Sequence, residues 1–246
     1  MRQLKAFLLI LFFASSLTAQ ITADNFDLYA TETDDTTFTL SNFTTTTNPN
    51  KIILCFVGHD GNSVDDITTY TFNGDSLTTQ IQVTNSSAAT AEMWYRLEED
   101  VVTNGTATAG TVGFTVRSAG ACYALYNVLQ SGTFRDSDSA QSTGATSSSL
   151  SLTTEAGDVL FDCIYVRNGS TAVGTLTQSN GTELEEVSRN IGFIRAACRT
   201  QTATGTSVTA DWGWTESSHF AHVAVTLIPD AITTPTNSPL ESTVIR

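Results

Sequence analysis

Four oxygen-bearing side chains follow one another closely in one short segment of the chain. They are Asp60, Asn62, Asp65 and Asp66. Hard cations such as Ca²⁺ prefer oxygen ligands, and acids at alternating positions of a loop supply them at a workable spacing. The later bidentate glutamate of a helix-flanked calcium loop is missing, and the same composition is typical of a solvated turn. Calcium is therefore the one cofactor that the sequence suggests, and a solvated turn is the alternative.

Aromatic residues form a second group with chemical potential. Trp212 and Trp214 are two residues apart, so on a strand both lie on one face, with Trp94 or Tyr95 on a neighbouring strand. A row of exposed rings can stack on sugars, because it offers a flat apolar surface with a polar rim. Trp and Tyr are more often largely buried, so we favour the core as their location. If these four residues were exposed, they would form a glycan-binding site.

Residues that could catalyse a reaction are few. Acidic clusters at residues 98–100 and 183–186 could supply the carboxylate pair of a glycosidase, but both are typical of strand ends or loops. His219 and His222 are three residues apart, so on a strand they point to opposite faces, which disfavours a metal pair. With His59 as the remaining histidine and no elbow motif around a serine, a Ser-His-Asp triad has few candidates. The sequence therefore assigns no catalytic residue.

The first nineteen residues have the features of a secretory signal peptide. Arg2 and Lys5 precede an apolar run from Ala6 to Ala14, and small residues lead up to Gln20. The apolar run is too short to span a bilayer, and no later stretch reaches the eighteen or so apolar residues that a spanning helix needs. We therefore expect a secreted or cell-surface protein with no membrane span in the mature chain.

The mature chain is strongly acidic. Removing Arg2 and Lys5 leaves nine basic residues against 25 acidic ones, a net charge of −16. Such a surface repels phosphate backbones and anionic lipids, which argues against nucleic-acid binding and membrane docking. It favours solubility and suits cations or basic partners. The abundance of threonine and the scarcity of helical patterns favour strands.

The chain contains an internal repeat. Residues 36–129 and 146–228 show the same order of short strand candidates, separated by Gly, Asn, Ser or Asp clusters. Lys51 to Gly58 and Asp158 to Val166 are apolar on both faces, so we expect each to be a central strand covered on both sides. Each half offers about six strands. This pattern predicts an all-β fold, an antiparallel β-sandwich of about 10–12 strands.

The two halves could form one sandwich or two separate domains. The junction from residue 131 to 149 is a Ser/Asp/Thr-rich loop without Pro-rich or charged linker character, so we favour one sandwich over residues 36–229. Residues 20–35 are then an N-terminal extension. Residues 230–246, with Pro235 and Pro239 and no periodicity, are expected to be a flexible tail.

Four cysteines lie within predicted strands: Cys55, Cys122, Cys163 and Cys198. An even count in an exported chain predicts disulfides, but each also fits a small buried hydrophobe. Three pairings stay open, and no two cysteines are close enough in sequence for a typical zinc site. In the repeat, Cys55 and Cys163 fall one residue apart on equivalent strands, so they should face opposite sides. That argues against a symmetric pair of bridges.

Several strand phrases carry a resemblance to a known group. They are NKIIL at 50–54, YTFNG at 70–74, MWY at 93–95, TEAGDVL at 154–160 and VAVTL at 223–227. Together they resemble a loose group of secreted bacterial jelly-roll-like β-sandwich domains of unassigned activity, over roughly residues 36–229. The resemblance implies an accessory or surface module and carries over no functional residue.

Two functional hypotheses follow. The first is a non-enzymatic, secreted or cell-surface β-sandwich that binds glycan or protein, mediates adhesion, or assembles with copies of itself. It rests on the export signal, the lack of an active-site pattern and the resemblance. The alternative is a carbohydrate-active enzyme, a glycoside hydrolase or lyase, with an acidic pair in a sandwich groove.

Overall fold

The computed structural model describes residues 20–30, 36–43, 50–61, 66–85, 89–98, 105–111, 117–189 and 193–230. The predicted signal peptide and the predicted tail beyond residue 230 lie outside them. All regular structure in this part of the chain is strand, and every strand pairing is antiparallel. No helix in the described ranges is long and apolar enough to cross a membrane.

Fourteen strands are formed within the described residues. They are β1 (Thr22–Ala30), β2 (Thr37–Phe43), β3 (Lys51–His59), β4 (Ile67–Phe72), β5 (Asp75–Ser76), β6 (Thr78–Asn85), β7 (Ala89–Glu98), β8 (Gly105–Thr111), β9 (Ser118–Tyr126), β10 (Phe134–Thr153), β11 (Val159–Arg167), β12 (Thr182–Arg189), β13 (Ile194–Thr202) and β14 (Ser207–Leu227).

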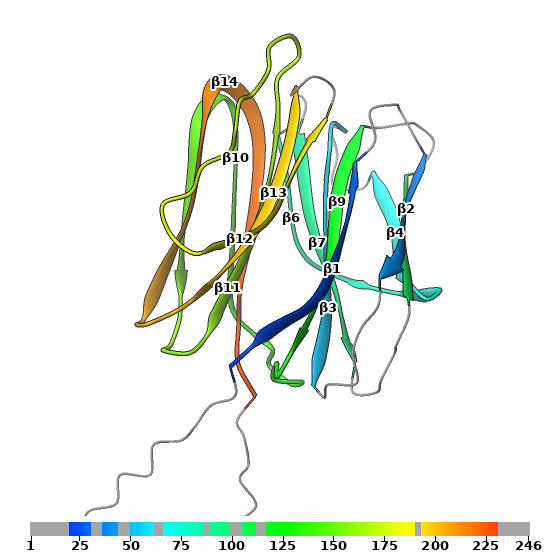
Figure 1. Cartoon of the computed structure of the whole chain (residues 1–246), viewed down its shortest axis with the longest axis vertical. Coiled ribbons are helices and arrows are strands. Elements are labelled where there is room, and N and C mark those ends of the chain that lie inside the picture. The colour runs from blue at the N-terminus through cyan, green and yellow to red at the C-terminus, as the bar shows by residue number, and fades with distance from the viewer. Residues whose placement is uncertain are drawn as a thin grey trace, which may run out of the picture.

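The strands form three sheets, which Figure 1 shows side by side. The first large sheet has the order β1-β9-β3-β7-β6, the second large sheet β10-β14-β11-β13-β12, and the small sheet β2-β8-β4-β5. If the five strands of each large sheet are numbered by their place in the chain, both sheets follow the order 1-5-2-4-3. The two large sheets therefore share one topology.

A shared core joins the two halves. The two large sheets pack face to face, and their inward side chains form one cluster, which we call the central core. Tyr123 of β9 and Phe161 of β11 meet edge to face there, with ring centroids 5.0 Å apart. At the sheet edges β1 lies beside β12, and β6 lies beside β10. In the repeat, β1 corresponds to β10 and β6 corresponds to β12. Exchanging the halves therefore converts one edge contact into the other, so the halves are related by an approximate two-fold axis.

The middle strand of the first large sheet is buried on both faces, as the sequence predicted. Leu54 and Phe56 of β3 enter the central core, while Ile53 and Val57 face the small sheet. These alternate positions pack with Tyr70 and other residues of the small sheet in a first outer core. Strand β11 has the same two-sided burial in the second large sheet. Successive side chains of a strand point to opposite faces, so a strand that is apolar at every position lies between two layers.

The second half builds its outer layer from two long strands. The ladder between β10 and β14 is interrupted at Ser142, Ala145 and Ser147, and there both strands bend over (Figure 1). Their outer ends bring Leu150 and Val208 onto Leu160 of β11. The bent ends therefore cover the outer face of the second large sheet, as the small sheet covers the outer face of the first.

The predicted N-terminal extension and the predicted junction loop both contain strands. The predicted extension at residues 20–35 contains β1, which pairs with β9 along its length. The predicted junction at residues 131–149 lies largely within β10. Both segments are rich in Thr, Ser and Asp, which are typical of loops, but each strand lies at the edge of its sheet. A strand at the edge of a sheet can contain many polar residues, so composition alone did not distinguish these strands from irregular segments.

Both cysteine pairs form disulfides between neighbouring strands. Cys55 of β3 bonds Cys122 of β9, and Cys163 of β11 bonds Cys198 of β13. The first lies in the outer core of its half and the second in the central core. Cys55 and Cys163 therefore face opposite sides, as their one-residue offset predicted, and the bridges are not equivalent by the repeat. Two disulfides are consistent with an extracellular protein.

Candidate functional site

The four aromatic residues considered for stacking do not form an exposed row. Trp94, Trp212 and Trp214 are buried, at 8%, 2% and 6% exposure. Tyr95 packs edge to face on Phe134, with ring centroids 4.9 Å apart. Trp94 lies in the first outer core, Trp212 and Trp214 pack on residues of β11, and Tyr95 packs against the central core. The stacking site is therefore wrong, and the favoured alternative of core residues holds for the three tryptophans.

The acidic loop after β3 has protein partners for its described carboxylates. Asp60 lies 3.5 Å from Arg117 Nε and 3.4 Å from an Arg167 Nη atom, and it accepts the Arg117 backbone N–H at 2.8 Å. Asp66 is buried, 4.0 Å from His59 Nδ1. Asn62 and Asp65 lie outside the described residues. No group of three metal-ligating side chains occurs in the described part of the chain, and calcium stays a prediction.

The carboxylate pair of the enzyme hypothesis lies beyond what the structure describes. Residues 99–100 are outside the described ranges, and for Glu98 and residues 183–186 the backbone strand is described without the side chains. His219 and His222 do point to opposite sides: His222 is fully buried, and His219 is partly exposed. They form no metal pair.

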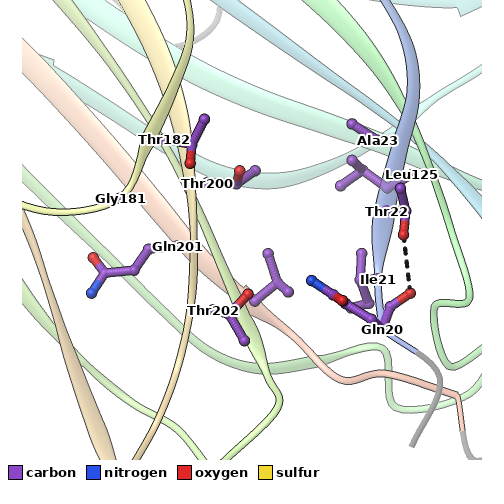
Figure 2. Close-up of a pocket in the computed structure, with 11 residues that line it drawn as sticks. Gln20, Ile21, Thr22, Ala23, Leu125, Gly181, Thr182, Thr200, Gln201 and Thr202 are labelled. Atoms are coloured by element: carbon purple, nitrogen blue, oxygen red, sulfur yellow. Dashed lines mark hydrogen bonds between the residues drawn. The ribbon is translucent and has the colours of Figure 1, made fainter.

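A groove opens at one edge of the contact between the two large sheets. Its cavity of about 480 Å³ lies between the start of β1 and the end of β13 (Figure 2). Ile21, Leu125 and Val159 form its apolar side, and Thr and Gln side chains such as Thr202 form the rest. It holds no charged side chain and no cluster of chemically reactive groups.

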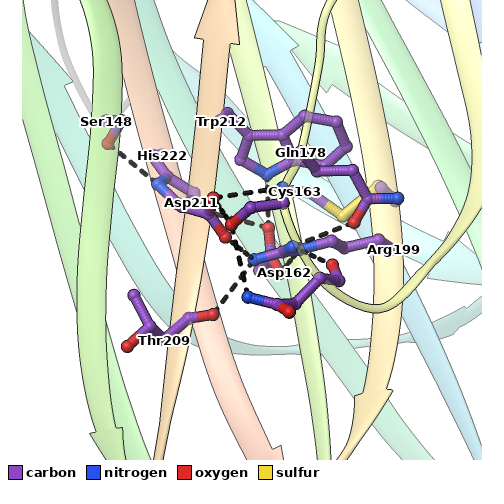
Figure 3. Close-up of polar contacts among 12 residues, drawn as sticks. Ser148, Asp162, Cys163, Gln178, Arg199, Thr209, Asp211, Trp212 and His222 are labelled. Atoms are coloured by element: carbon purple, nitrogen blue, oxygen red, sulfur yellow. Dashed lines mark hydrogen bonds and ion pairs between the residues drawn. A yellow bond between two sulfur atoms is a disulfide. The ribbon is translucent and has the colours of Figure 1, made fainter.

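A fully buried polar network lies between the two layers of the second half (Figure 3). Its centre is Asp162 of β11, whose Oδ2 accepts from Arg199 Nε at 2.7 Å. Its Oδ1 accepts from the Trp212 indole and from His222 Nε2, the latter at 3.2 Å. Asp162, Arg199 and His222 all have 0% exposure. Buried charges require such pairing, because an unpaired carboxylate would lose its hydration without compensation.

The hydrogen bonds of His222 join Ser148 to Asp162. An ionised Asp162 can only accept, so Nε2 of the imidazole carries a hydrogen. Ser148 Oγ lies 2.9 Å from Nδ1 and donates to it when that nitrogen carries a lone pair. The network thus runs from the Ser148 hydroxyl through the imidazole to a carboxylate held by a guanidinium. Strand register explains the assembly, because Asp162 faces Arg199 across β11–β13 and Ser148 faces Trp212 across β10–β14.

The network ends at a shallow pocket on the surface, which we call the outer pocket. It has a volume of about 400 Å³ and lies between β10, β14 and the segment that precedes β12. Its lining consists of Ser147, Ser148, Ser149, Thr177, Gln178, Ser179, Asp211, Trp212 and Gly213. Small-molecule sites typically measure about 300–1,000 Å³, so it can hold a small ligand or one unit of a chain.

The outer pocket has one ionised acceptor, Asp211. Burial disfavours its charge, but hydrogen bonds from Ser179 and the nearby Arg199 guanidinium outweigh this, so the pKa of Asp211 is lowered. Arg199 Nη2 lies 3.3 Å from Asp211 Oδ1, and Arg199 Nη1 donates to Gln178 Oε1 at 2.9 Å. One buried guanidinium therefore positions both the acid and the amide of the pocket.

The first half contains a second buried carboxylate–histidine network. Glu92 of β7 is fully buried and accepts from His59 Nε2 at 3.2 Å, and from Trp94 Nε1 and Gln82 Nε2 at 3.0 Å each. His59 Nδ1 accepts from the Gly61 backbone N–H at 3.1 Å. Both halves thus bury a carboxylate that accepts from a histidine and a tryptophan, but the two networks lie on strands that do not correspond in the repeat, and the second ring nitrogen meets a backbone N–H in one and a serine hydroxyl in the other.

The sequence-based search missed the outer pocket and its network. Their residues come from four strands and one loop, and Ser148, Asp162, Arg199 and His222 lie far apart in the sequence. One signal was available: Asp162 lies within a strand that is apolar on both faces, where a charge needs a buried partner. No family model, curated protein or solved structure matches this chain.

Proposed function

We propose that this chain is an exported binding module that recognises neutral, hydroxyl-rich ligands, such as glycans, in the outer pocket. Export is supported by the predicted signal peptide and by two disulfides, which persist in oxidising compartments. The observation that carries the proposal is the outer pocket itself, where an ionised carboxylate, an amide and several hydroxyls converge on one small cavity.

The pocket's chemistry suits sugar hydroxyls. A carboxylate accepts two hydroxyl hydrogens, an amide both donates and accepts, and serine hydroxyls rotate to match either role. Asp211 and the acidic surface disfavour anionic ligands. The lining side chains are held by strands and by Arg199, so the site is formed before the ligand arrives, which lowers the entropic cost of binding.

A glycan array followed by calorimetry tests this proposal, each with and without Ca²⁺. Asp211→Asn should weaken binding of an array-positive glycan about tenfold or more, because a hydrogen bond to a charged group contributes about 1.5–3 kcal/mol. Glu216→Gln, an exposed position of β14 outside the pocket, is the matched control and should leave affinity unchanged. Thermal unfolding confirms that both variants are folded.

Two results would contradict the proposal. One is an array without any binding in either buffer. The other is glycan binding that Asp211→Asn leaves intact, which would place the site elsewhere, the edge groove of Figure 2 being the next candidate. A concentration-dependent increase in sedimentation coefficient without glycan binding would favour the self-assembly hypothesis instead.

A further inference from the structure

We propose that Ser148, His222 and Asp162 form a catalytic relay that hydrolyses small carboxylic esters in the outer pocket. This activity goes beyond glycan binding and does not depend on which glycan the pocket accepts. It follows from the hydrogen bonds of the network, from the position of Ser148 at the pocket, and from a comparison between the two halves.

The geometry is that of a nucleophile, a base and an orienting acid. Ser148 Oγ donates to His222 Nδ1 at 2.9 Å, and His222 Nε2 donates to Asp162 Oδ1 at 3.2 Å. Both distances lie within or at the limit of the range expected for a hydroxyl nucleophile and its base. The ring nitrogens have exchanged roles relative to the usual serine hydrolase, but either nitrogen can accept a proton while the other donates.

The orienting acid is itself fixed. Asp162 accepts from the Arg199 guanidinium on one oxygen and from the Trp212 indole on the other. These two donors hold the carboxylate in place, and the carboxylate holds the imidazole in the tautomer with hydrogen on Nε2. When His222 accepts a second proton, Asp162 lies beside the resulting positive charge. Arg199 reduces that stabilisation, so we expect a modest rate rather than that of a fast hydrolase.

The first half contains a buried carboxylate–histidine pair on other strands, which serves as a comparison. There the lone pair of the buried imidazole, on His59 Nδ1, is occupied by the backbone N–H of Gly61. A backbone amide is not a nucleophile under these conditions. In the second half the group beside the imidazole is a hydroxyl, and Ser148 lines an open pocket. Pairing a buried carboxylate with a histidine does not require a hydroxyl there, whereas catalysis does.

The reaction balances with water as the sole co-reactant. Ser148 Oγ attacks the carbonyl carbon of the ester while its proton passes to His222 Nδ1. The bond from the carbonyl carbon to the alkoxy oxygen then breaks, and His222 returns the proton to the departing alcohol. Water attacks the acyl-serine in the same way, giving its proton to His222, and the carboxylic acid leaves as Ser148 regains its hydrogen.

The pocket limits which ester can react. A shallow cavity of about 400 Å³ lined by hydroxyls fits a short acyl group, such as acetyl, better than a long chain. Gln178 lines the same pocket, and its oxygen accepts from Arg199, which places its amide nitrogen on the side away from the guanidinium (Figure 3). The same nitrogen lies on the far side of the network from Ser148, so Gln178 contributes to the wall of the pocket and not to the stabilisation of the carbonyl oxygen.

Active-site labelling tests the relay directly. The folded protein is incubated with a fluorophosphonate probe, digested and analysed by mass spectrometry, with p-nitrophenyl acetate hydrolysis measured in parallel. We expect the label on the peptide containing Ser148, and Ser148→Ala should abolish labelling and lower the hydrolysis rate at least 100-fold, towards the uncatalysed background. Ser151→Ala, an exposed serine of β10 outside the pocket, should keep both within twofold.

Clear results would overturn the relay. Absence of label on the Ser148 peptide of the folded wild-type protein would do so without any variant, and so would hydrolysis by a folded Ser148→Ala variant at the wild-type rate. Near-ultraviolet circular dichroism establishes folding. The two proposals fail separately: glycan binding without labelling refutes the relay alone, whereas labelling without glycan binding supports the relay and refutes the binding function.

Discussion

Replacing Asp162 by asparagine removes the anion of the buried network while keeping its shape. Arg199 has 0% exposure and loses the carboxylate oxygen 2.7 Å from its Nε. Removing one partner of a buried ion pair costs about 3–5 kcal/mol, because the remaining charge is left without compensation. Asp211 lies 3.3 Å from Arg199 and offsets part of the loss, which places the expected cost at the lower end, about 3 kcal/mol.

The first half provides a matched comparison, Glu92→Gln. Glu92 is equally buried, but its donors are a neutral imidazole, an indole and an amide, so no buried cation is left behind. The cost is then that of imperfectly satisfied hydrogen bonds, about 1–3 kcal/mol. We therefore expect Asp162→Asn to destabilise the protein more than Glu92→Gln does, by up to about 2 kcal/mol.

A double-mutant cycle isolates the charge pair. Arg199→Met alone removes the cation and leaves Asp162 with its two neutral donors. In the double variant neither charge remains, and an apolar side chain of similar length takes the guanidinium's place, so much of the loss should be recovered. The coupling energy between the two positions should be about 2 kcal/mol or more, as expected for residues in direct contact.

Urea unfolding at pH 7, followed by tryptophan fluorescence, measures these differences. Trp212 and Trp94 each donate to one of the two carboxylates, so both networks have a local reporter. The midpoints should shift with unchanged slope. A cost below about 1 kcal/mol for Asp162→Asn, or a cost smaller than that of Glu92→Gln, would refute the view that a paired, fully buried Arg199 depends on this carboxylate.

Three further predictions concern the framework. Replacing each disulfide by two alanines should lower the free energy of unfolding in guanidinium by about 4 kcal/mol. Loss of the β3–β9 bridge should cost about 0.6 kcal/mol more than loss of the β11–β13 bridge, because it closes a loop of 67 residues and the other closes one of 35. The reverse order would contradict the loop-entropy explanation. Gly58→Ala should cost about 1–3 kcal/mol by thermal unfolding, since its Cβ would lie 2.4 Å from the Tyr165 Cβ, whereas Gly205→Ala meets nothing within 4 Å and should have little effect. The backbone N–H of Thr153 lowers the pKa of Asp136 below 3.8, so its contribution is present above that pH and is lost as the pH falls through the folded-state pKa. Asp136→Asn should accordingly lower the urea midpoint at pH 7 and change it less at about pH 2.5; equal changes at both would exclude an ionised Asp136 as the cause.

The central architecture was predictable because it depends on local patterns. Two strands that are apolar on both faces can only lie between layers, and β3 and β11 are the middle strands of the two large sheets. The offset between Cys55 and Cys163 also gave the correct facing, since side chains alternate along a strand. Such inferences succeed because the period of a strand is fixed by backbone geometry and does not depend on distant contacts.

Other features depend on residues that are remote in sequence and were missed. Strand β10 is polar because it lies at an edge, so its composition resembles that of a loop. Ser148 and His222 are 74 positions apart, and they meet because β10 and β14 bend over together. The bend coincides with a shift in the register between the two strands. No single stretch of sequence specifies such a shift. The candidate site was therefore accessible only from the fold.

The two-fold relation between the large sheets suggests an origin and a practical use. A chain comprising one half alone would expose the whole apolar face that now forms the central core, and an exposed face of that kind leads to homodimers. Duplication and fusion of such a homodimer would produce the present arrangement and would let each copy acquire its own buried network. By the same reasoning, the two halves expressed as separate polypeptides should recombine by fragment complementation, with the central core as the contact that reunites them.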